Sequence, residues 1–255
     1  MIKAFKDEGA AYKEIEIPAD RSEKQKLLRA LMNVRMPGPM SAEVLDVQDA
    51  YLRERAEEKG IIGLQDIPVI CDGLSVWQGD ITQLVVDAIV NAANSAMLGC
   101  FVPGHNCIDN CIQTYAGVQM RAECDRQMKL LKREYGQSYV QPTAIPLLTD
   151  GYNLPAKKVV HIVGPVVTGS LTQKHKTELA ACYTNTLDLC MREGFKSLAF
   201  CCISTGVFHF PNEEAAEIAV NTVRGWQEAH GNAMERIIFN VFKDEDKKCY
   251  ENLIQ

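Results

Sequence analysis

Two thiols and one imidazole lie within a single eight-residue stretch of the chain, CFVPGHNC at residues 100–107. Thiolate sulfur and imidazole nitrogen are ligands that zinc prefers in proteins. Three protein ligands leave the fourth coordination position open, which is the arrangement found in catalytic zinc sites. The spacing of Cys100, His105 and Cys107 therefore predicts a metal site that is able to do chemistry.

Two other interpretations of this stretch stay open. Free cysteines are often buried, inert side chains, and a single histidine is more often structural than a ligand. Cys111 follows Cys107 by four residues, so on a helix it lies one turn further along the same face. A set of three cysteines and one histidine is typical of closed, structural zinc sites. Because Pro103 and Gly104 bend the loop, the local spacing favours metal binding.

A carboxylate and two amides flank the cysteine stretch. The motif Asn91-Ala-Ala-Asn94 precedes it, and Asp109 comes two residues after Cys107. A carboxylate beside a metal-activated water is a candidate general base or water-positioning group. Asp109 also suits the first turn of a helix, where the dipole stabilises a negative charge. The two roles are compatible.

Two more motifs follow predicted strands. Asp80, in GDIT at residues 79–82, is placed to accept a hydrogen bond from a ligand amine or hydroxyl. The segment STGVFHFP at residues 204–211 leads into a predicted helix, whose free N–H groups and dipole favour phosphate. Gly206 permits the backbone angles of such a cradle. Taken singly, each motif is equally typical of an ordinary turn.

Alternating strands and helices must position these motifs from about residue 74 onward. Apolar runs rich in β-formers predict strands at 74–77, 88–90, 144–148, 159–163, 198–203 and 237–241. Helical periodicity predicts helices at 108–131, 177–192, 212–230 and 246–253. Continuous apolar strands between amphipathic helices indicate an α/β fold, with a buried sheet and helices on both faces.

The first 70 residues have a different pattern and predict a separate N-terminal helical extension, with the main domain spanning 71–255. Helices are expected at 22–36 and from Ser41 to about Gly60, and together they predict a hairpin. A packing appendage is the favoured interpretation, and a platform for a substrate or partner is the alternative.

Composition limits the partners and the compartment. The net charge of −6 disfavours broad nucleic-acid binding, which needs a basic surface, but permits a small anionic ligand. The chain has no run of 18 apolar residues, and its first residues lack the apolar core of a secretory signal. Ten cysteines then fit reduced thiols. We expect a cytoplasmic monomer with no membrane or nucleic-acid partner.

In combination, Asp80 after the first strand, Asn91-Ala-Ala-Asn94 after the second and STGVF before a late helix resemble the macrodomain family, from Leu74 to the C-terminus. The resemblance implies a three-layer α/β/α fold with a mixed central sheet that binds ADP-ribose. It implies that Asp80 and the Ile81 amide hold the adenine, with Phe242 nearby, and that Asn94 contacts the distal ribose. The diphosphate and distal ribose are then wrapped by Ser204, Thr205, Gly206, Val207 and Phe208, and Phe210 packs beside that ribose.

Two departures from the usual family pattern are informative. The glycine-rich run of hydrolytic macrodomains is replaced here by the Cys100–Cys107 stretch, which looks like the zinc-containing branch of the family. That branch also has an N-terminal helical extension, and the resemblance favours three protein ligands, with Cys111 facing the core. His209 stands where many relatives have glycine, either as a loop-packing residue or as a substrate contact.

This branch implies a zinc-dependent hydrolase that removes mono-ADP-ribose from protein side chains by glycosidase- or esterase-type hydrolysis, with Asp109 and Asn94 catalytic. Relatives in it resemble partners of bacterial sirtuin-type ADP-ribosyltransferases that act on lipoyl carrier proteins, which suggests an aspartate or glutamate ester as substrate. The alternatives are a non-catalytic ADP-ribose-binding module with structural zinc and an O-acyl-ADP-ribose deacylase. The metal ligands beside Asp109 favour catalysis.

Overall fold

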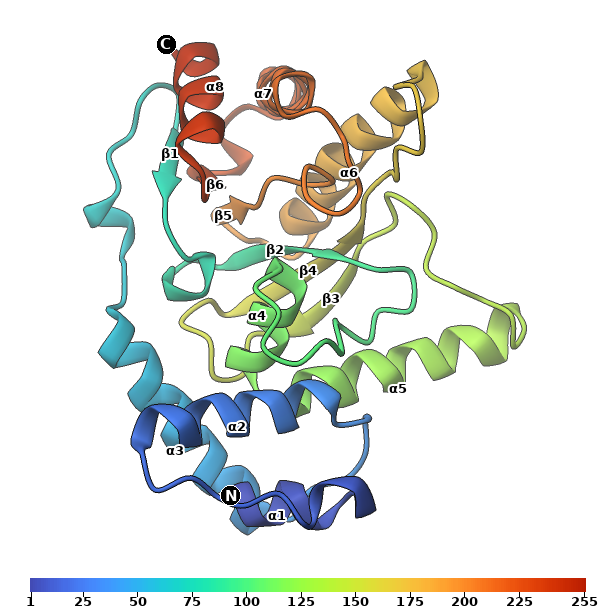
Figure 1. Ribbon diagram of the computed structural model, residues 1–255. Coiled ribbons are helices and arrows are strands. Elements are labelled where there is room, and N and C mark those ends of the chain that lie inside the picture. The colour runs from blue at the N-terminus through green and yellow to red at the C-terminus, as the bar shows by residue number, and fades with distance from the viewer.

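A computed structural model describes residues 1–255, the side chain of Asn232 apart. Its centre is a mixed six-stranded sheet in the order β1-β6-β5-β2-β4-β3 (Figure 1). The strands are β1 (Leu74–Gln78), β2 (Ala88–Ala93), β3 (Leu147–Asp150), β4 (Lys158–Val163), β5 (Ser197–Phe200) and β6 (Arg236–Val241). Only β3, at the edge, pairs antiparallel with its neighbour.

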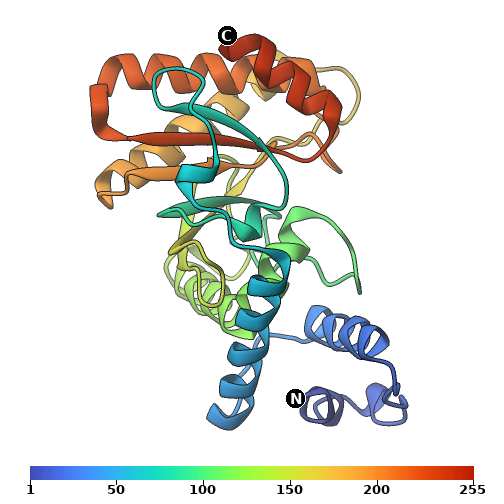
Figure 2. The same ribbon diagram turned by 90° about the vertical axis from the view of Figure 1, so that its left-hand side faces the viewer.

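Helices cover both faces of the sheet, which confirms the three-layer prediction (Figure 2). On one face lie α4 (Ile108–Ala116) and α5 (Val118–Tyr135). On the other lie α6 (Gln173–Arg192), α7 (Asn212–His230) and α8 (Asp244–Ile254). Four short 3₁₀ turns complete the chain, at Ala10–Tyr12, Leu64–Asp66, Ile81–Gln83 and Gly231–Ala233.

Several predicted elements have different limits in the structure. The strand expected at 88–90 continues to Ala93, so Asn91 lies within β2 rather than after it, and the helix expected from Thr177 begins at Gln173. The helix expected over 108–131 is two helices, because Gly117 adopts a φ of 99° between α4 and α5. The strand expected at 144–148 begins only at Leu147, after Pro146, whose ring removes a ladder donor. The strand expected to reach Ile203 ends at Phe200, so the following residues form a loop at the edge of the sheet.

The N-terminal extension contains α1 (Ile2–Asp7), α2 (Arg21–Val34) and α3 (Ala42–Lys59). Ser41 caps α3 as predicted, and its side chain accepts a hydrogen bond from Val44 N. Ion pairs join Arg21, at the start of α2, to α3 near its end, as in a hairpin. Helix α1 was not predicted from the sequence and is only six residues long. A second small core holds the extension to α5 and consists of Phe5, Leu28, Leu31, Met32, Leu52 and Val118.

The parallel strands bring the separate motifs to one edge of the sheet. Asp80 follows β1, Asn94 follows β2, the 201–211 loop follows β5 and Phe242 follows β6. From β2 the chain passes to α4 on one face, whereas from β5 it passes to α7 on the other. Open α/β sheets bind ligands in the crevice that such diverging loops leave. Among the described residues, no helix combines the length and hydropathy needed to cross a membrane.

Asp87 makes the stability of the fold depend on pH. It lies just before β2, at the amino-terminal ends of the parallel strands. Its carboxylate accepts hydrogen bonds from the backbone N–H groups of Lys196 and Ser197 at 2.8 and 3.0 Å, and it pairs with Lys157 at 2.7 Å. Burial alone raises the pKa of Asp87, but these contacts outweigh burial and lower the pKa to about 2. A depressed pKa stabilises the fold above the ordinary value of 3.8, and this contribution is lost as the pH falls towards 2.

We therefore expect Asp87→Asn to lower the free energy of unfolding at pH 6 and to flatten its decline between pH 4 and 2. Urea denaturation at a series of pH values measures both quantities. Glu251→Gln, at an exposed ion pair on α8, serves as the control and should leave the profile unchanged. An Asp87→Asn profile as steep as that of the unsubstituted protein would contradict the assignment.

Candidate active site

The three predicted metal ligands converge in the structure. Cys100 and His105 lie on the loop after β2, and Cys107 is the N-cap residue of α4. Their ligand atoms all lie within 4.8 Å of one another, and Cys100 Sγ is 3.5 Å from His105 Nδ1. A tetrahedral zinc ion with ordinary bond lengths separates its sulfur and nitrogen ligands by about 3.5 Å, so the donor set and spacing fit zinc.

Cys111 lies outside this group. Among the described residues, the group that could hold a metal ion contains only the two cysteines and His105. The thiol of Cys111 instead accepts a hydrogen bond from Arg29 Nη2 at 3.6 Å. Cys111 is half-buried and faces α2 rather than the core, which corrects that part of the prediction. His105 is exposed, so the group is open to solvent on one side.

Asp109 lies between the two asparagines of the predicted motif. It is 6% exposed, its Oδ1 accepts from Asn91 Nδ2 at 2.8 Å, and its Oδ2 accepts from Asn94 Nδ2 at 3.2 Å. Burial raises the pKa of Asp109 to about 6, although the two amides and the charge of Arg121 oppose the rise. The backbone oxygen of Gly99 also accepts from Asn94 at 3.1 Å, so Asn94 connects the carboxylate to the metal loop.

His161 orients the Asn91 amide from the neighbouring strand, although the sequence did not predict this role. His161 is 0% exposed on β4, and burial lowers its pKa to about 3, so the ring is neutral. Asn91 Nδ2 lies 3.0 Å from His161 Nδ1, and Thr149 Oγ1 lies 2.9 Å from Nε2. Since Nδ1 must accept from the amide, Nε2 carries the proton and donates to Thr149. Both hydrogens of Asn91 are thereby directed, one to Asp109 and one to His161.

Asp80 follows β1, which the strands β6 and β5 separate from β2 in the sheet. Its Oδ1 accepts from Thr82 N at 3.0 Å, and its Oδ2 accepts from Lys59 Nζ at 2.7 Å. Burial raises the pKa of Asp80, but the bonds from Lys59 and Thr82 outweigh it and hold the pKa below its ordinary value. Lys59 ends α3 and also lies 3.3 Å from the ring centroid of Tyr115. The sequence analysis missed this contact of the extension with Asp80. The side chain of Ile81 is 1% exposed.

The loop after β5 bends tightly over residues 204–208, hereafter the curl, before α7 begins at Asn212. Ser204 has a φ of 66° and its backbone oxygen accepts from Phe210 N at 3.0 Å, while His209 N donates to Gly206 O at 3.0 Å. His209 has a φ of 58°, a region that glycine adopts without strain. Its side chain is exposed, so it does not pack inside the loop, and substrate contact remains as the prediction for it.

The curl presents its tip to solvent and keeps its base fixed. Val207 is 68% exposed, and the space around Gly206 is open. Thr205 Oγ1 donates to Cys202 O at 3.1 Å, and Phe208 O accepts from Val167 N at 2.9 Å. Phe210 is 1% exposed within the main core, so its predicted place beside a ribose stays a prediction.

Comparisons with known proteins agree with this architecture. The Macro domain family model matches residues 90–219. The chain is 48% identical over 258 residues to "Protein-ADP-ribose hydrolase" of Treponema medium, covering 100% of this chain and 96% of that protein. It is 44% identical over 237 residues to the protein of the same name from Staphylococcus aureus (strain MRSA252), covering 92% and 86%.

A solved structure places the same fold beside its ligand. The Trypanosoma brucei macrodomain in complex with ADP-ribose has 28% sequence identity and a TM-score of 0.66, covering 89% of this chain and 95% of that one. The region that the family model matches, residues 90–219, runs from β2 into α7 and contains the Asn91-Ala-Ala-Asn94 motif, the candidate metal ligands, Asp109 and the curl after β5. By the family match and by its relatives, the chain belongs to the Macro domain family.

Proposed function

We propose that this chain is a zinc-dependent hydrolase that releases ADP-ribose from mono-ADP-ribosylated protein side chains. Relatives that share 44–48% identity over almost the whole chain carry the name "Protein-ADP-ribose hydrolase". The observation that carries the proposal is the buried Asp109 carboxylate, which two amides hold and which lies two residues after Cys107 of the three-ligand group. A module that only binds ADP-ribose needs neither feature.

ADP-ribose is expected to lie along the edge where the parallel strands end. Asp80 and the Ile81 amide recognise the adenine, and Phe242 covers it. The curl formed by Ser204, Thr205, Gly206, Val207 and Phe208 wraps the diphosphate, because backbone N–H groups at the start of α7 favour anions. The distal ribose then reaches Asn94 and Phe210, and its reactive carbon points towards the metal loop.

Hydrolysis consumes one water and yields ADP-ribose and the free side chain. Cys100, His105 and Cys107 would hold a zinc ion, which when bound would supply Lewis acidity for the reaction. Asp109 takes the proton that the attacking water loses. Asn91 and Asn94 fix both carboxylate oxygens with N–H donors, so the base is already oriented when the substrate arrives.

The proposed linkage is an ester to aspartate or glutamate, and the proposed protein substrate is a lipoyl carrier protein modified by a sirtuin-type transferase. We place the enzyme in the bacterial cytoplasm, as a monomer. The net charge of −6 disfavours a broad basic binding surface, so we expect the protein partner to bind at a local site.

The linkage can be tested with two proteins, one ADP-ribosylated on aspartate or glutamate and one on arginine. We expect release of ADP-ribose from the acidic linkage and little release from arginine, as measured by chromatography of the free nucleotide. Tight ADP-ribose binding without any release would support a binding module instead. Release only from O-acyl-ADP-ribose would make the chain a deacylase.

Phe242 tests the adenine end of the site. The side chain is 79% exposed directly after β6, so it contributes little to the core. Stacking on an aromatic ring is worth about 0.5–1.5 kcal/mol, so Phe242→Ala should weaken ADP-ribose binding by about 2- to 10-fold. Calorimetry measures the affinity, and thermal unfolding should stay unchanged. Val47→Ala, an exposed apolar residue on α3, is the matched control, and equal affinities for all three proteins would remove Phe242 from the site.

A further inference from the structure

Two side chains of α2 reach the backbone of the metal loop. Arg29 and Asn33 lie one helical turn apart, so they share a face of the helix. Asn33 is 1% exposed, and its Oδ1 accepts a hydrogen bond from Gly104 N at 2.9 Å. Arg29 Nη2 donates to His105 O at 2.7 Å. The peptide unit before Gly104 and the one after His105 are therefore both held by the N-terminal extension.

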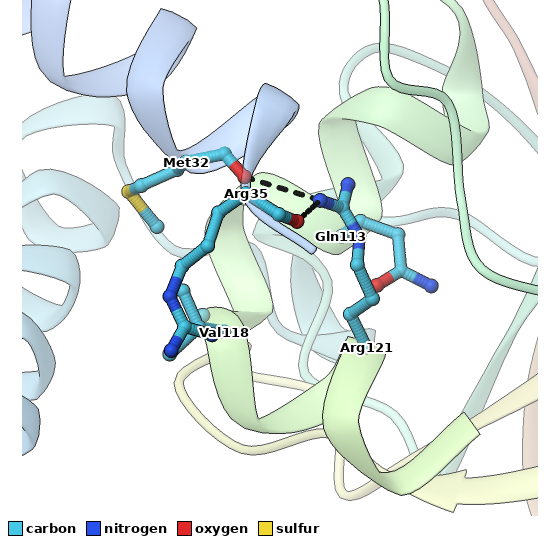
Figure 3. Close-up of a pocket in the computed structure, with 6 residues that line it drawn as sticks. Met32, Arg35, Gln113, Val118 and Arg121 are labelled. Atoms are coloured by element: carbon cyan, nitrogen blue, oxygen red, sulfur yellow. Dashed lines mark hydrogen bonds between the residues drawn. The ribbon is translucent and has the colours of Figure 1, made fainter. Parts of the chain in front are cut away.

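The C-terminal end of α2 is fixed at the same place. Arg121 of α5 donates from Nη1 to the backbone oxygens of Met32, Asn33 and Arg35 at 3.2, 2.9 and 2.6 Å. Figure 3 shows the bonds to Met32 and Arg35. These carbonyls end the helix and lack partners within it, and a cation there also suits the dipole. The Arg121 guanidinium lies 4.3 Å from the ring centroid of Phe101 in the metal loop. One buried arginine thus joins α2 to the loop.

The loop is held from its other side by α4. Asn110 is 0% exposed, and its Nδ2 donates to Cys100 O at 3.3 Å and to Val102 O at 3.0 Å. Its Oδ1 accepts from Arg29 Nη2 at 3.2 Å. Side chains from α2 and α4 therefore meet each other and hold the loop backbone at four successive points.

These contacts matter because a loop that contains Pro103 and Gly104 has no secondary structure of its own. Ordering a free residue costs about 1–2 kcal/mol in backbone entropy, so a loop ordered in advance binds a metal more tightly. Groups that orient metal ligands typically change the affinity by about 10- to 100-fold when they are removed. Leu28, Leu31 and Met32 already supply the packing of α2 in the small core. Packing therefore does not require the further polar contacts that Arg29 and Asn33 make with this loop.

We propose that α2 belongs to the metal site, with Arg29 and Asn33 as positioning residues that preset the His105 segment for zinc. This inference rests on the proposed function, in that the metal group binds zinc. It gives the extension a role at the active site, beyond the packing role that the sequence favoured.

The test measures zinc affinity directly, by competition with a chromophoric chelator, for the full chain and its variants. Asn33→Leu removes the bond to Gly104 with the same number of side-chain heavy atoms, and Arg29→Met removes the bond to His105. We expect each substitution to weaken zinc binding by about 10- to 100-fold. Arg29→Lys keeps a donor and should recover part of the loss. With cobalt as a probe, the visible bands of the thiolate complex should weaken in Arg29→Met and return in Arg29→Lys.

Two controls separate positioning from folding. Leu28→Ala removes a side chain that is 3% exposed in the small core of the extension, and it leaves Arg29 and Asn33 unchanged. Lys24→Ala changes an exposed residue of the same helix. Both should bind zinc as the unsubstituted chain does, even if Leu28→Ala unfolds at a lower temperature. Arg29 is only half-buried, so Arg29→Met keeps the test usable if Asn33→Leu fails to fold.

The outcomes are distinguishable. If the unsubstituted protein binds zinc and folded Arg29→Met binds it equally tightly, the inference is wrong and the proposed function stands. If the unsubstituted protein binds no zinc, the proposed zinc dependence fails and the inference fails with it. A loss of affinity in Leu28→Ala as large as that in Asn33→Leu would reduce α2 to a packing element.

Discussion

Replacing Asp109 with asparagine should lower kcat for ADP-ribose release by about 100- to 10,000-fold, the usual contribution of a general base, while ADP-ribose still binds. The amide cannot take a proton from water. It also presents an N–H group towards Asn91 or Asn94, both of which now donate to the carboxylate. The nucleotide contacts at Asp80 and the 204–208 curl are untouched, so binding and turnover should separate.

Single-turnover release and calorimetric binding of ADP-ribose measure the two quantities. Asp246→Asn is the matched control, because Asp246 is also 6% exposed, also lies in the first turn of a helix and also accepts from an asparagine, Asn212. It should lose stability without a comparable loss of kcat. Equal kcat losses in the two variants would show that Asp109 only stabilises the first turn of α4.

Cys107→Ser should abolish both stoichiometric zinc binding and hydrolysis. Serine is among the best N-cap residues, so it can replace the thiol that accepts from Asn110 N at 3.4 Å at the start of α4. A neutral hydroxyl is not among the usual ligands of zinc, so the metal group loses one of its three donors. The fold should therefore survive a substitution that removes the metal.

Metal analysis of the purified variant and its circular dichroism spectrum check the two halves of this expectation. Cys111→Ser, four residues further along the same helix, is the control and should retain zinc, because Cys111 faces Arg29. Loss of zinc from Cys111→Ser would mean a closed site with four protein ligands. Retention of zinc in Cys107→Ser would remove Cys107 from the ligand set.

Features encoded by neighbouring residues could be predicted from the sequence. The metal group lies within residues 100–107 and Asp109 follows directly, so their proximity requires no knowledge of the fold. Helix α7 was predicted with its observed limits, because Pro211 precedes it and Gly231 ends it. The strands β1, β4 and β6 were found by their continuous apolar runs, which a sheet buried on both faces requires.

Contacts between distant segments could not be predicted. Lys59 meets Asp80 because α3 ends at the sheet edge, and the periodicity of α3 says nothing about where it docks. His161 lies inside an apolar strand, and its link to Asp109 runs through Asn91 on a neighbouring strand. The break at Gly117 was missed because the apolar spacing continues across it, while the φ of 99° depends on tertiary packing.

The central claim is that zinc at the three-ligand group is required for hydrolysis, and removing and restoring the metal tests it most directly. Purified protein is depleted with a chelator, the chelator is removed, and release of ADP-ribose from an aspartate- or glutamate-linked substrate is measured before and after one equivalent of zinc is added. We predict that release is lost on depletion and restored by zinc, while ADP-ribose binding through Asp80 persists throughout. Full release by metal-free protein would contradict the account.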